Sequence, residues 1–263
     1  MSKLPARTGV EWLRQGFALF RRQPGLMTTV AISNVMATLV LTLFFPLIGP
    51  IAAVVLGPSL NMAILQACAV LDENRRIAPG VLLTGFRKPQ LGMLSKLGLL
   101  HLAITLVLVL IMAFSLSDEF IQTMRTTMDP AKGKVGMAEV LAAIPAGDLV
   151  AMRVVGALNI ASWILLYFAT PLVFWKGMKP FKAAFYSVFA VLGAAGPFLV
   201  MLLVWCGALF GCLLLVSLLL GQTTLGGVLL LWVVLLFWLL LQCGIYAAYR
   251  QIFGAPDLLA PPA

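Results

Sequence analysis

The chain has 263 residues, of which 62% are hydrophobic and only 10% are charged, and its formal net charge is +9. Soluble domains usually carry about 25% charged residues, so a chain of this composition has too few polar side chains to cover a surface that faces water. The composition therefore excludes an ordinary soluble domain and predicts an integral membrane protein. Because the basic residues form no compact basic domain, we expect no nucleic-acid partner.

The first long apolar segment lies between Arg22 and Asp72, which enclose 49 residues without a charged side chain. A helix needs about 20 residues to cross the ~30 Å hydrocarbon core, so this segment must cross the membrane twice. The turn is expected at residues 46–50, Pro-Leu-Ile-Gly-Pro, because proline lacks an amide donor and glycine tolerates unusual dihedral angles. A second pair, Gly57-Pro58, falls inside the second span, where we predict a kink or break in the helix.

Four further apolar segments follow, and together the segments predict an all-α polytopic membrane helical bundle with six transmembrane helices. The bundle is expected to occupy residues 26–249, between a cytoplasmic amphipathic helix at residues 1–25 and a cytoplasmic tail at residues 250–263. An outer loop is expected at residues 117–149, in which Ser117 and the two acids after it favour a helix start. The predicted spans are residues 26–45, 51–71, 97–116, 153–174, 198–220 and 227–249.

The distribution of basic residues predicts the orientation of the chain, because Lys and Arg accumulate on the cytoplasmic side of a membrane. With six spans, both termini share one side, and that side holds fourteen of the eighteen Lys and Arg residues. The other four flank or lie within the predicted outer loop. We therefore expect a multi-pass protein of the bacterial inner membrane with both termini in the cytoplasm.

The segment "TGVEWLRQGFALFRRQPG" before the first span is amphipathic at about 100° per residue. Thr8 and Glu11 are spaced for a capping box at the start of a helix. We predict a helix that lies flat on the cytoplasmic leaflet, with an apolar face toward the acyl chains and a basic face toward anionic lipid headgroups. The alternative is that the apolar face packs on protein. The predicted apolar contacts are Trp12, Leu13, Phe17 and Phe20, and the predicted headgroup contacts are Arg14, Arg21 and Arg22.

Two later segments resemble this first one. "APGVLLTGFRKPQLG" precedes the third span and "KPFKAAFYSVFAVLGAAGP" precedes the fifth, and each begins near a proline and ends in Gly and Pro. The pattern predicts three units, each a surface helix followed by a transmembrane hairpin. The alternative is that any three hairpins need segments by which the chain re-enters the membrane, and both interpretations stay open.

Polar side chains inside the spans have two interpretations. Interhelical hydrogen bonds, each worth on the order of 0.6 kcal/mol, account for them most simply. The other interpretation is a polar cluster formed by Asn34, Asn61 and Asn159.

Residues typical of catalytic or metal sites are sparse. All four cysteines, at positions 68, 206, 212 and 243, fall within spans and are expected to be small packing residues. His101 is the only histidine, and no neighbouring acid or cysteine along the chain supplies the partner that a general base or a metal site needs. We therefore expect neither an enzyme nor a bound cofactor or metal.

The order of features is similar to that of a known group of proteins. "PARTGVEWLRQGFALFRRQP", then "FPLIGPIAAVVLGPSLNMAILQACAVLDENR", then a short helix ending in "GFRK", resembles an uncharacterised family of multi-pass inner-membrane proteins of Gram-negative bacteria. The chain also resembles, more distantly, the membrane domain fused to some glycerophosphodiester phosphodiesterases. The resemblance implies topology and location, and it implies no activity because the phosphodiesterase catalytic domain is absent.

Two functions are compatible with these features. The first is a non-enzymatic membrane protein that organises lipids or partner proteins, which the basic surface helices and the lack of charge within the spans favour. The second is a permease for an apolar or zwitterionic small solute, which the Gly57-Pro58 pair favours because broken helices often flank transport sites.

Overall fold

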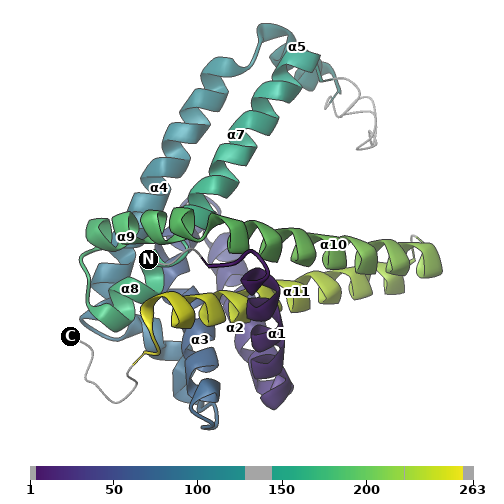
Figure 1. Ribbon diagram of the computed structural model, residues 1–263. Coiled ribbons are helices and arrows are strands. Elements are labelled where there is room, and N and C mark those ends of the chain that lie inside the picture. Colours follow the sequence, from purple (N-terminus) through teal and green to yellow (C-terminus); the bar gives the residue numbers. More distant parts are fainter. Residues whose placement is uncertain (1–3, 128–143, 222, 257–263) are drawn as a thin grey trace. The chain divides into compact units, whose positions relative to one another are not determined.

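The computed structural model describes residues 4–127, 144–221 and 223–256, and these residues contain ten α-helices, one 3-10 helix and no β-strand. The predicted all-α fold class is therefore confirmed (Figure 1). The parts of the predicted outer loop and tail at residues 128–143 and 257–263 lie outside the described residues. The elements are α1 Thr8–Arg22, α2 Pro24–Phe44, α3 Gly49–Asp72, η1 Pro79–Phe86, α4 Gln90–Ser115, α5 Asp118–Thr127, α7 Ala146–Leu165, α8 Ala169–Lys176, α9 Pro180–Gly193, α10 Ala195–Leu220 and α11 Thr224–Phe253.

Six of these segments are long and apolar enough to cross a membrane, as predicted. Five are single helices, and the remaining one combines α7 and α8. Each predicted span overlaps one of them, and three of the six segments extend beyond the predicted bounds by a turn or more. The six segments are Pro24–Phe44, Gly49–Asp72, Gln90–Ser115, Ala146–Lys176, Ala195–Leu220 and Thr224–Phe253.

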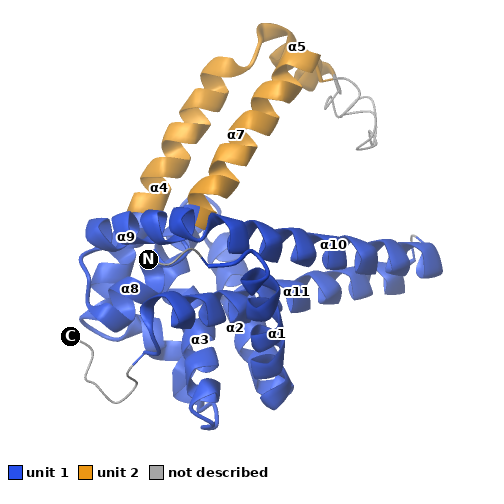
Figure 2. Ribbon diagram, in the orientation of Figure 1, with its two compact units in different colours: residues 1–99, 165–263 blue, residues 100–164 orange. Residues whose placement is uncertain are grey.

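The chain divides into two compact units (Figure 2). Unit 2 comprises residues 100–164 and contains α5, α7 and most of α4. Within it, the ring centroids of His101 and Trp163 lie 4.8 Å apart. Near the other end of the two long helices, the Asp148 carboxylate accepts hydrogen bonds from the backbone N–H and the hydroxyl of Ser117, at 2.9 and 2.6 Å. The Ser117 hydroxyl in turn accepts from the N–H of Phe120 at 3.1 Å, which confirms the predicted helix start.

Unit 1 comprises residues 1–99 and 165–263, and α3 is its central helix. In the most apolar 18-residue window of each span, 56% of the α3 residues are buried, compared with 6% of those in α10. The hydrophobic core surrounds the second half of α3, with contributions from α1, α2, η1 and α11. The residues of α3 in this core are Met62, Ala63, Ile64, Leu65, Ala67, Cys68, Ala69 and Leu71.

Two glycines let neighbouring elements approach the middle of α3. A Cβ atom on Gly85 of η1 would lie 2.1 Å from the carbonyl oxygen of Ser59, and one on Gly98 of α4 would lie 2.0 Å from that of Val55. Small residues permit this kind of close packing between membrane helices. The segment of α3 from Val55 to Ser59 is thus held between η1 and the first turns of α4.

The predicted break at Gly57-Pro58 is wrong, and the predicted kink there stays a prediction. α3 continues through Gly57 and Pro58 without interruption, and Pro58 is buried inside it. Proline within a membrane helix is tolerated where neighbouring helices pack against it. The turn between α2 and α3 occupies residues 45–48, so Gly49 and Pro50 already belong to α3 and not to the turn, as proline suits the first helical positions.

The order of elements matches the predicted pattern of a surface segment followed by a hairpin. α1 precedes α2 and α3, η1 precedes the hairpin of unit 2, and α9 precedes α10 and α11. The α2–α3 and α10–α11 pairs pack as hairpins within unit 1. The middle surface segment is a 3-10 helix of eight residues and not an α-helix.

Candidate functional site

α1 packs against the last helix of the chain at a pair of glycines. Gly16 of α1 and Gly244 of α11 lie so close that a Cβ atom on Gly16 would be 2.5 Å from the backbone nitrogen of Gly244. Gly9 contacts α10 in the same way, because a Cβ atom on it would lie 2.1 Å from the carbonyl oxygen of Pro197. The glycines along α1 thus form the surface by which this helix docks on α10 and α11.

Trp12 is fully buried in this contact, and the prediction that it lies in the lipid is wrong. Its indole Nε1–H donates to the side-chain oxygen of Gln251 at 2.5 Å, and its ring lies 5.2 Å from that of Phe198. An amphipathic helix can bury its apolar face in protein as well as in a leaflet. Trp12 is buried against α10 and α11 of the same chain. The capping box is also wrong, because α1 begins at Thr8 itself and has no side-chain cap.

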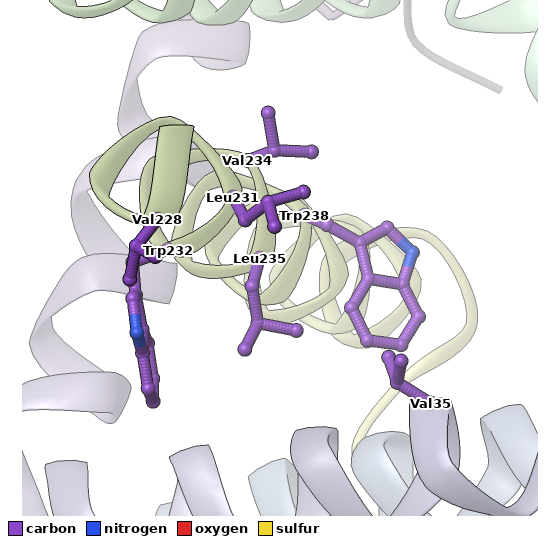
Figure 3. A pocket seen from close by; sticks show the side chains of 7 residues that line it. All are labelled: Val35, Val228, Leu231, Trp232, Val234, Leu235 and Trp238. Atoms are coloured by element: carbon purple, nitrogen blue, oxygen red, sulfur yellow. The ribbon is translucent and has the colours of Figure 1, made fainter. Parts of the chain in front are cut away.

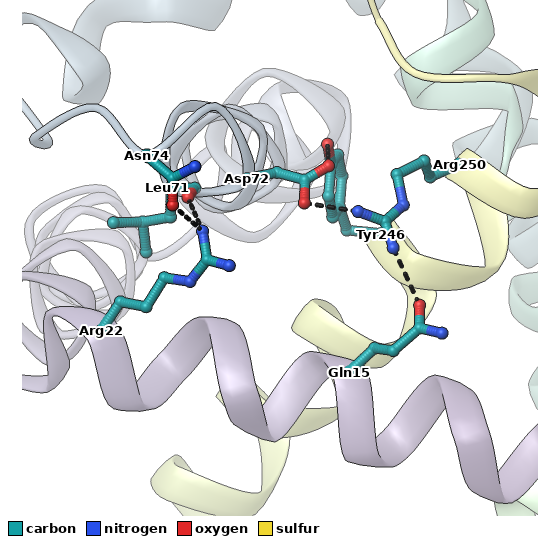
Figure 4. A network of polar contacts seen from close by, with 7 residues as sticks. All are labelled: Gln15, Arg22, Leu71, Asp72, Asn74, Tyr246 and Arg250. Carbon is teal, nitrogen blue, oxygen red and sulfur yellow. Dashed lines mark hydrogen bonds and ion pairs between the residues drawn. The ribbon is translucent and has the colours of Figure 1, made fainter.

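The C-terminal ends of α3 and α11 meet α1 in a network of polar contacts, which we call the polar clamp: Gln15, Arg22, Asp72, Asn74, Tyr246 and Arg250 (Figure 4). At its centre, the Arg250 guanidinium forms an ion pair with the Asp72 carboxylate. Arg250 also donates to Gln15 at 3.0 Å, and the Tyr246 hydroxyl donates to Asp72 at 3.0 Å. Asp72 at the end of α3 is therefore bonded to two residues of α11, and Arg250 of α11 continues the network to α1.

Arg22 connects α1 directly to the end of α3. Its guanidinium donates to the carbonyl oxygen of Leu71 and, at 2.9 Å, to the side-chain oxygen of Asn74. Leu71 is in the last turn of α3, where carbonyl groups lack intrahelical partners and the helix dipole favours a cation. The predicted role of Arg22 as a headgroup contact is therefore corrected, because this side chain binds the end of α3.

The other predicted membrane-surface residues are divided between two environments. Phe17 is 48% exposed and its ring lies 5.8 Å below the Arg21 guanidinium, while Arg14 and Arg21 are exposed. Leu13 and Phe20 are half-buried, and Phe20 packs on the hydrophobic core. Lipid contact by these five side chains stays a prediction.

Two of the three predicted intramembrane asparagines lie on neighbouring helices of unit 1. The Asn34 side chain in α2 donates to the carbonyl oxygen of Leu60 in α3 at 3.0 Å, which is the interhelical bond expected of it. The side-chain oxygen of the adjacent Asn61 is buried and has no hydrogen-bond partner among the described residues. Asn159 belongs to unit 2, and its place beside the other two stays a prediction.

An apolar pocket of about 410 Å³ lies between α2 and α11 (Figure 3). One wall is Val35 of α2, and the α11 wall includes Trp232 and Trp238. Val35 and Trp238 also line a second pocket of about 280 Å³, whose α2 wall adds the polar side chains of Asn34, Thr38 and Thr42. The Thr38 and Thr42 hydroxyls donate to carbonyl groups of their own helix, each at 3.1 Å, so they present only acceptor oxygens to the pocket.

The sulfur atoms of Cys68 and Cys243 lie 3.4 Å apart in the core between α3 and α11. Both thiols are buried, whereas Cys206 is exposed and Cys212 is half-buried. Among the residues that the structure describes, no three His, Cys, Asp or Glu side chains are grouped so that they could hold a metal ion. Cys68 and Cys243 both belong to the hydrophobic core of unit 1, as expected of small apolar side chains.

The sequence patterns did not predict the contacts of the polar clamp. Asp72 is the acid that ends the charge-free segment and Arg250 is the basic residue of the predicted tail, but 178 positions separate them. Each is a charged residue at the end of a long apolar segment, and this shared feature could have suggested an ion pair between them.

Comparison with known proteins supports the assignment as a membrane protein. The chain is 26% identical over 275 residues to the "Probable inner membrane protein BTH_II0599" of Burkholderia thailandensis, which covers 98% of this chain and 96% of that protein. No protein family and no solved structure matches it, and the distant likeness to glycerophosphodiester phosphodiesterases gains no support. The near full-length similarity and the six apolar segments support a multi-pass protein of the inner membrane.

Proposed function

We propose that this inner-membrane protein is non-enzymatic and organises lipids or partner proteins, with both termini in the cytoplasm. The observation that carries the proposal is the contrast between the two halves of α11. From Leu239 to Tyr249 nearly every residue of α11 is buried, whereas its first half exposes Leu225, Val228, Leu231 and Trp232. The C-terminal half of α11 is therefore packed within the protein, and its N-terminal half exposes apolar side chains.

The polar clamp provides the fixed end. Apolar contacts between helices give little driving force inside a bilayer, because lipid tails are as apolar as leucine side chains. Hydrogen bonds and an ion pair at the helix ends therefore hold α1, α3 and α11 in place, and the exposed half of the α10–α11 hairpin is free to contact lipids or another membrane helix.

Mass spectrometry of the protein extracted from its native membrane in polymer nanodiscs tests the proposal. A lipid class or a protein should co-purify in a fixed ratio. Changing Leu203, Phe210 and Leu214 of α10 to alanine should reduce that ratio without unfolding the chain, because all three side chains are largely exposed. The matched control changes the exposed Leu106, Leu110 and Phe114 of α4. Bulk lipid composition with no protein in a fixed ratio would contradict the proposal.

A permease is the second candidate, and α3 supplies the observation that favours it. Pro58 leaves the carbonyl of Val54 without its usual intrahelical donor. The hydroxyl of Ser59 and the side-chain oxygen of Asn61 are buried within one turn of Pro58 and have no partner among the described residues. Unsatisfied polar atoms are costly in a membrane, and a polar solute that passes along α3 would satisfy them.

Flux measurements in proteoliposomes separate the two functions. A permease should give saturable uptake of a zwitterionic solute, and Asn61→Leu should abolish that uptake. The organising function predicts no saturable uptake by either protein.

A further inference from the structure

α9 presents an unusual surface for a helix of only 14 residues. The side chains of Phe181, Phe185, Phe189 and Leu192 are 76, 61, 58 and 58% exposed. At about 100° per residue these four positions fall within an arc of about 80°, so they form one stripe. The ring centroids of Phe185 and Phe189 lie 4.5 Å apart, so the middle of the stripe is a pair of adjacent aromatic rings.

The opposite face of α9 is fixed to the rest of unit 1. It buries Ala183, Ala184, Ser187, Ala190 and Val191. The Ser187 hydroxyl donates to the carbonyl oxygen of Leu165 at 2.7 Å and accepts from the N–H of Phe168 at 3.0 Å. These two bonds hold α9 on the turn between α7 and α8, so the direction of the exposed stripe is set by the fold.

Basic side chains surround the N-terminal end of this stripe. Lys176, Lys179 and Lys182 are all exposed, and the Lys182 ammonium lies 5.9 Å from the Tyr186 ring beside the stripe. The sequence contains no acidic residue between Leu149 and Pro256. Among the described residues, no ion pair involves any of the three lysines. This positive charge is therefore available to an anionic partner.

We propose that α9 is the element that anchors this protein in an anionic leaflet, with the stripe of Phe181, Phe185, Phe189 and Leu192 in the acyl boundary and the three lysines on phospholipid phosphates. A short helix that is too short to span, with an aromatic face and flanking lysines, suits the interface plane of a bilayer. The inference deepens the lipid-organising function proposed above and depends on it only for the choice of leaflet. α1, by contrast, uses Trp12 to contact α10 and α11 and Arg22 to contact α3 of the same chain.

Site-specific photocross-linking tests this placement in the full chain. The photoreactive analogue p-benzoylphenylalanine replaces Phe185, and the protein is reconstituted in vesicles of equal parts phosphatidylglycerol and phosphatidylcholine. Adducts with phospholipid are expected, and those with phosphatidylglycerol should dominate about fivefold or more, because one lysine near an anionic surface changes partitioning by roughly that factor. The same analogue at Phe168, which is fully buried, is the control and should react with its own chain.

The lysines are tested by changing Lys176, Lys179 and Lys182 to glutamine. The ratio of the two lipid adducts at Phe185 should fall to about one, since charge attraction alone separates the two lipids. The matched control removes the same charge from α1 and the residue before it by changing Arg7, Arg14 and Arg21 to glutamine, and should leave the ratio unchanged.

Three results would overturn the inference. The first is an adduct with another protein, which would identify the stripe as a protein interface. The second is the absence of any adduct at Phe185, as expected of a face in water. The third is a lipid ratio that does not respond to the lysine changes. A lipid adduct at Phe185 would stand even if no lipid class co-purified in a fixed ratio, so failure of the proposed function and failure of this inference are distinguishable.

Discussion

Gly16 of α1 lies against the backbone of Gly244 in α11, and the contact is asymmetric. A Cβ atom on Gly16 would lie 2.5 Å from the backbone nitrogen of Gly244, whereas a Cβ atom on Gly244 would lie 3.4 Å from its nearest neighbour, a methyl carbon of Leu13. The first distance requires the backbones to move apart, and the second is an ordinary van der Waals contact.

Gly16→Ala should therefore destabilise the protein by about 1–3 kcal/mol, the usual cost of overpacking, in spite of the higher helix propensity of alanine. Gly244→Ala should change the stability by less than about 1 kcal/mol. Free energies of unfolding from titration with dodecyl sulfate in mixed micelles provide the comparison. Gly25→Ala is the control, because nothing lies within 4 Å of a Cβ atom there. Equal effects at positions 16 and 244 would contradict the close crossing.

The ion pair between Asp72 and Arg250 should contribute to stability more than the neighbouring pair between Glu73 and Arg75. The side chains of Arg250 and Asp72 are 35 and 18% exposed, and Asp72 also accepts from Tyr246. Asp72→Asn should cost about 1–2 kcal/mol, because a partly buried, charge-assisted contact is lost. Glu73→Gln should change stability by less than about 1 kcal/mol, since exposed pairs contribute little, and this pair is 57 and 38% exposed.

The dependence of the two stability effects on ionic strength should also differ. Raising the ionic strength screens exposed charges more than buried ones, so the effect of Asp72→Asn should persist at high salt. If Asp72→Asn had no larger effect than Glu73→Gln under both conditions, the polar clamp would not hold α1, α3 and α11 together.

Unit 2 provides a local prediction. Asp148 is 3% exposed and accepts two hydrogen bonds from Ser117 at the start of α5. Asp148→Asn replaces one acceptor by a donor, so Ser117 should lose a bond worth about 1–3 kcal/mol. Hydrogen exchange should become faster in α5, which is measured by mass spectrometry of its peptides. The exposed Asp118→Asn is the control, and equal exchange in both variants would contradict the role of Asp148.

The sequence predicts the spans because hydropathy and length are local properties, and the six apolar segments could be read from composition. The polar clamp could not be predicted in this way, because the pairing of Asp72 with Arg250 depends on how α3 and α11 pack together. The same pattern of Trp12, Phe17 and Phe20 suits a leaflet or a protein surface, and only the glycines at positions 9 and 16 favour the protein. The exposed stripe of α9 could have been predicted from the spacing of Phe181, Phe185 and Phe189.

The position of the Trp12 side chain tests the central claim, that α1 is a structural part of the fold and not a free helix in the leaflet. The photoreactive analogue p-benzoylphenylalanine replaces Trp12 in the full chain, and Phe17, which is 48% exposed on the same helix, is replaced in a parallel protein. After irradiation in native membranes, peptide mass spectrometry should locate the position-12 adduct in α10 or α11, near Phe198 or Gln251. The position-17 analogue should give less intramolecular product. A lipid adduct as the main product at position 12 would contradict the docking of α1.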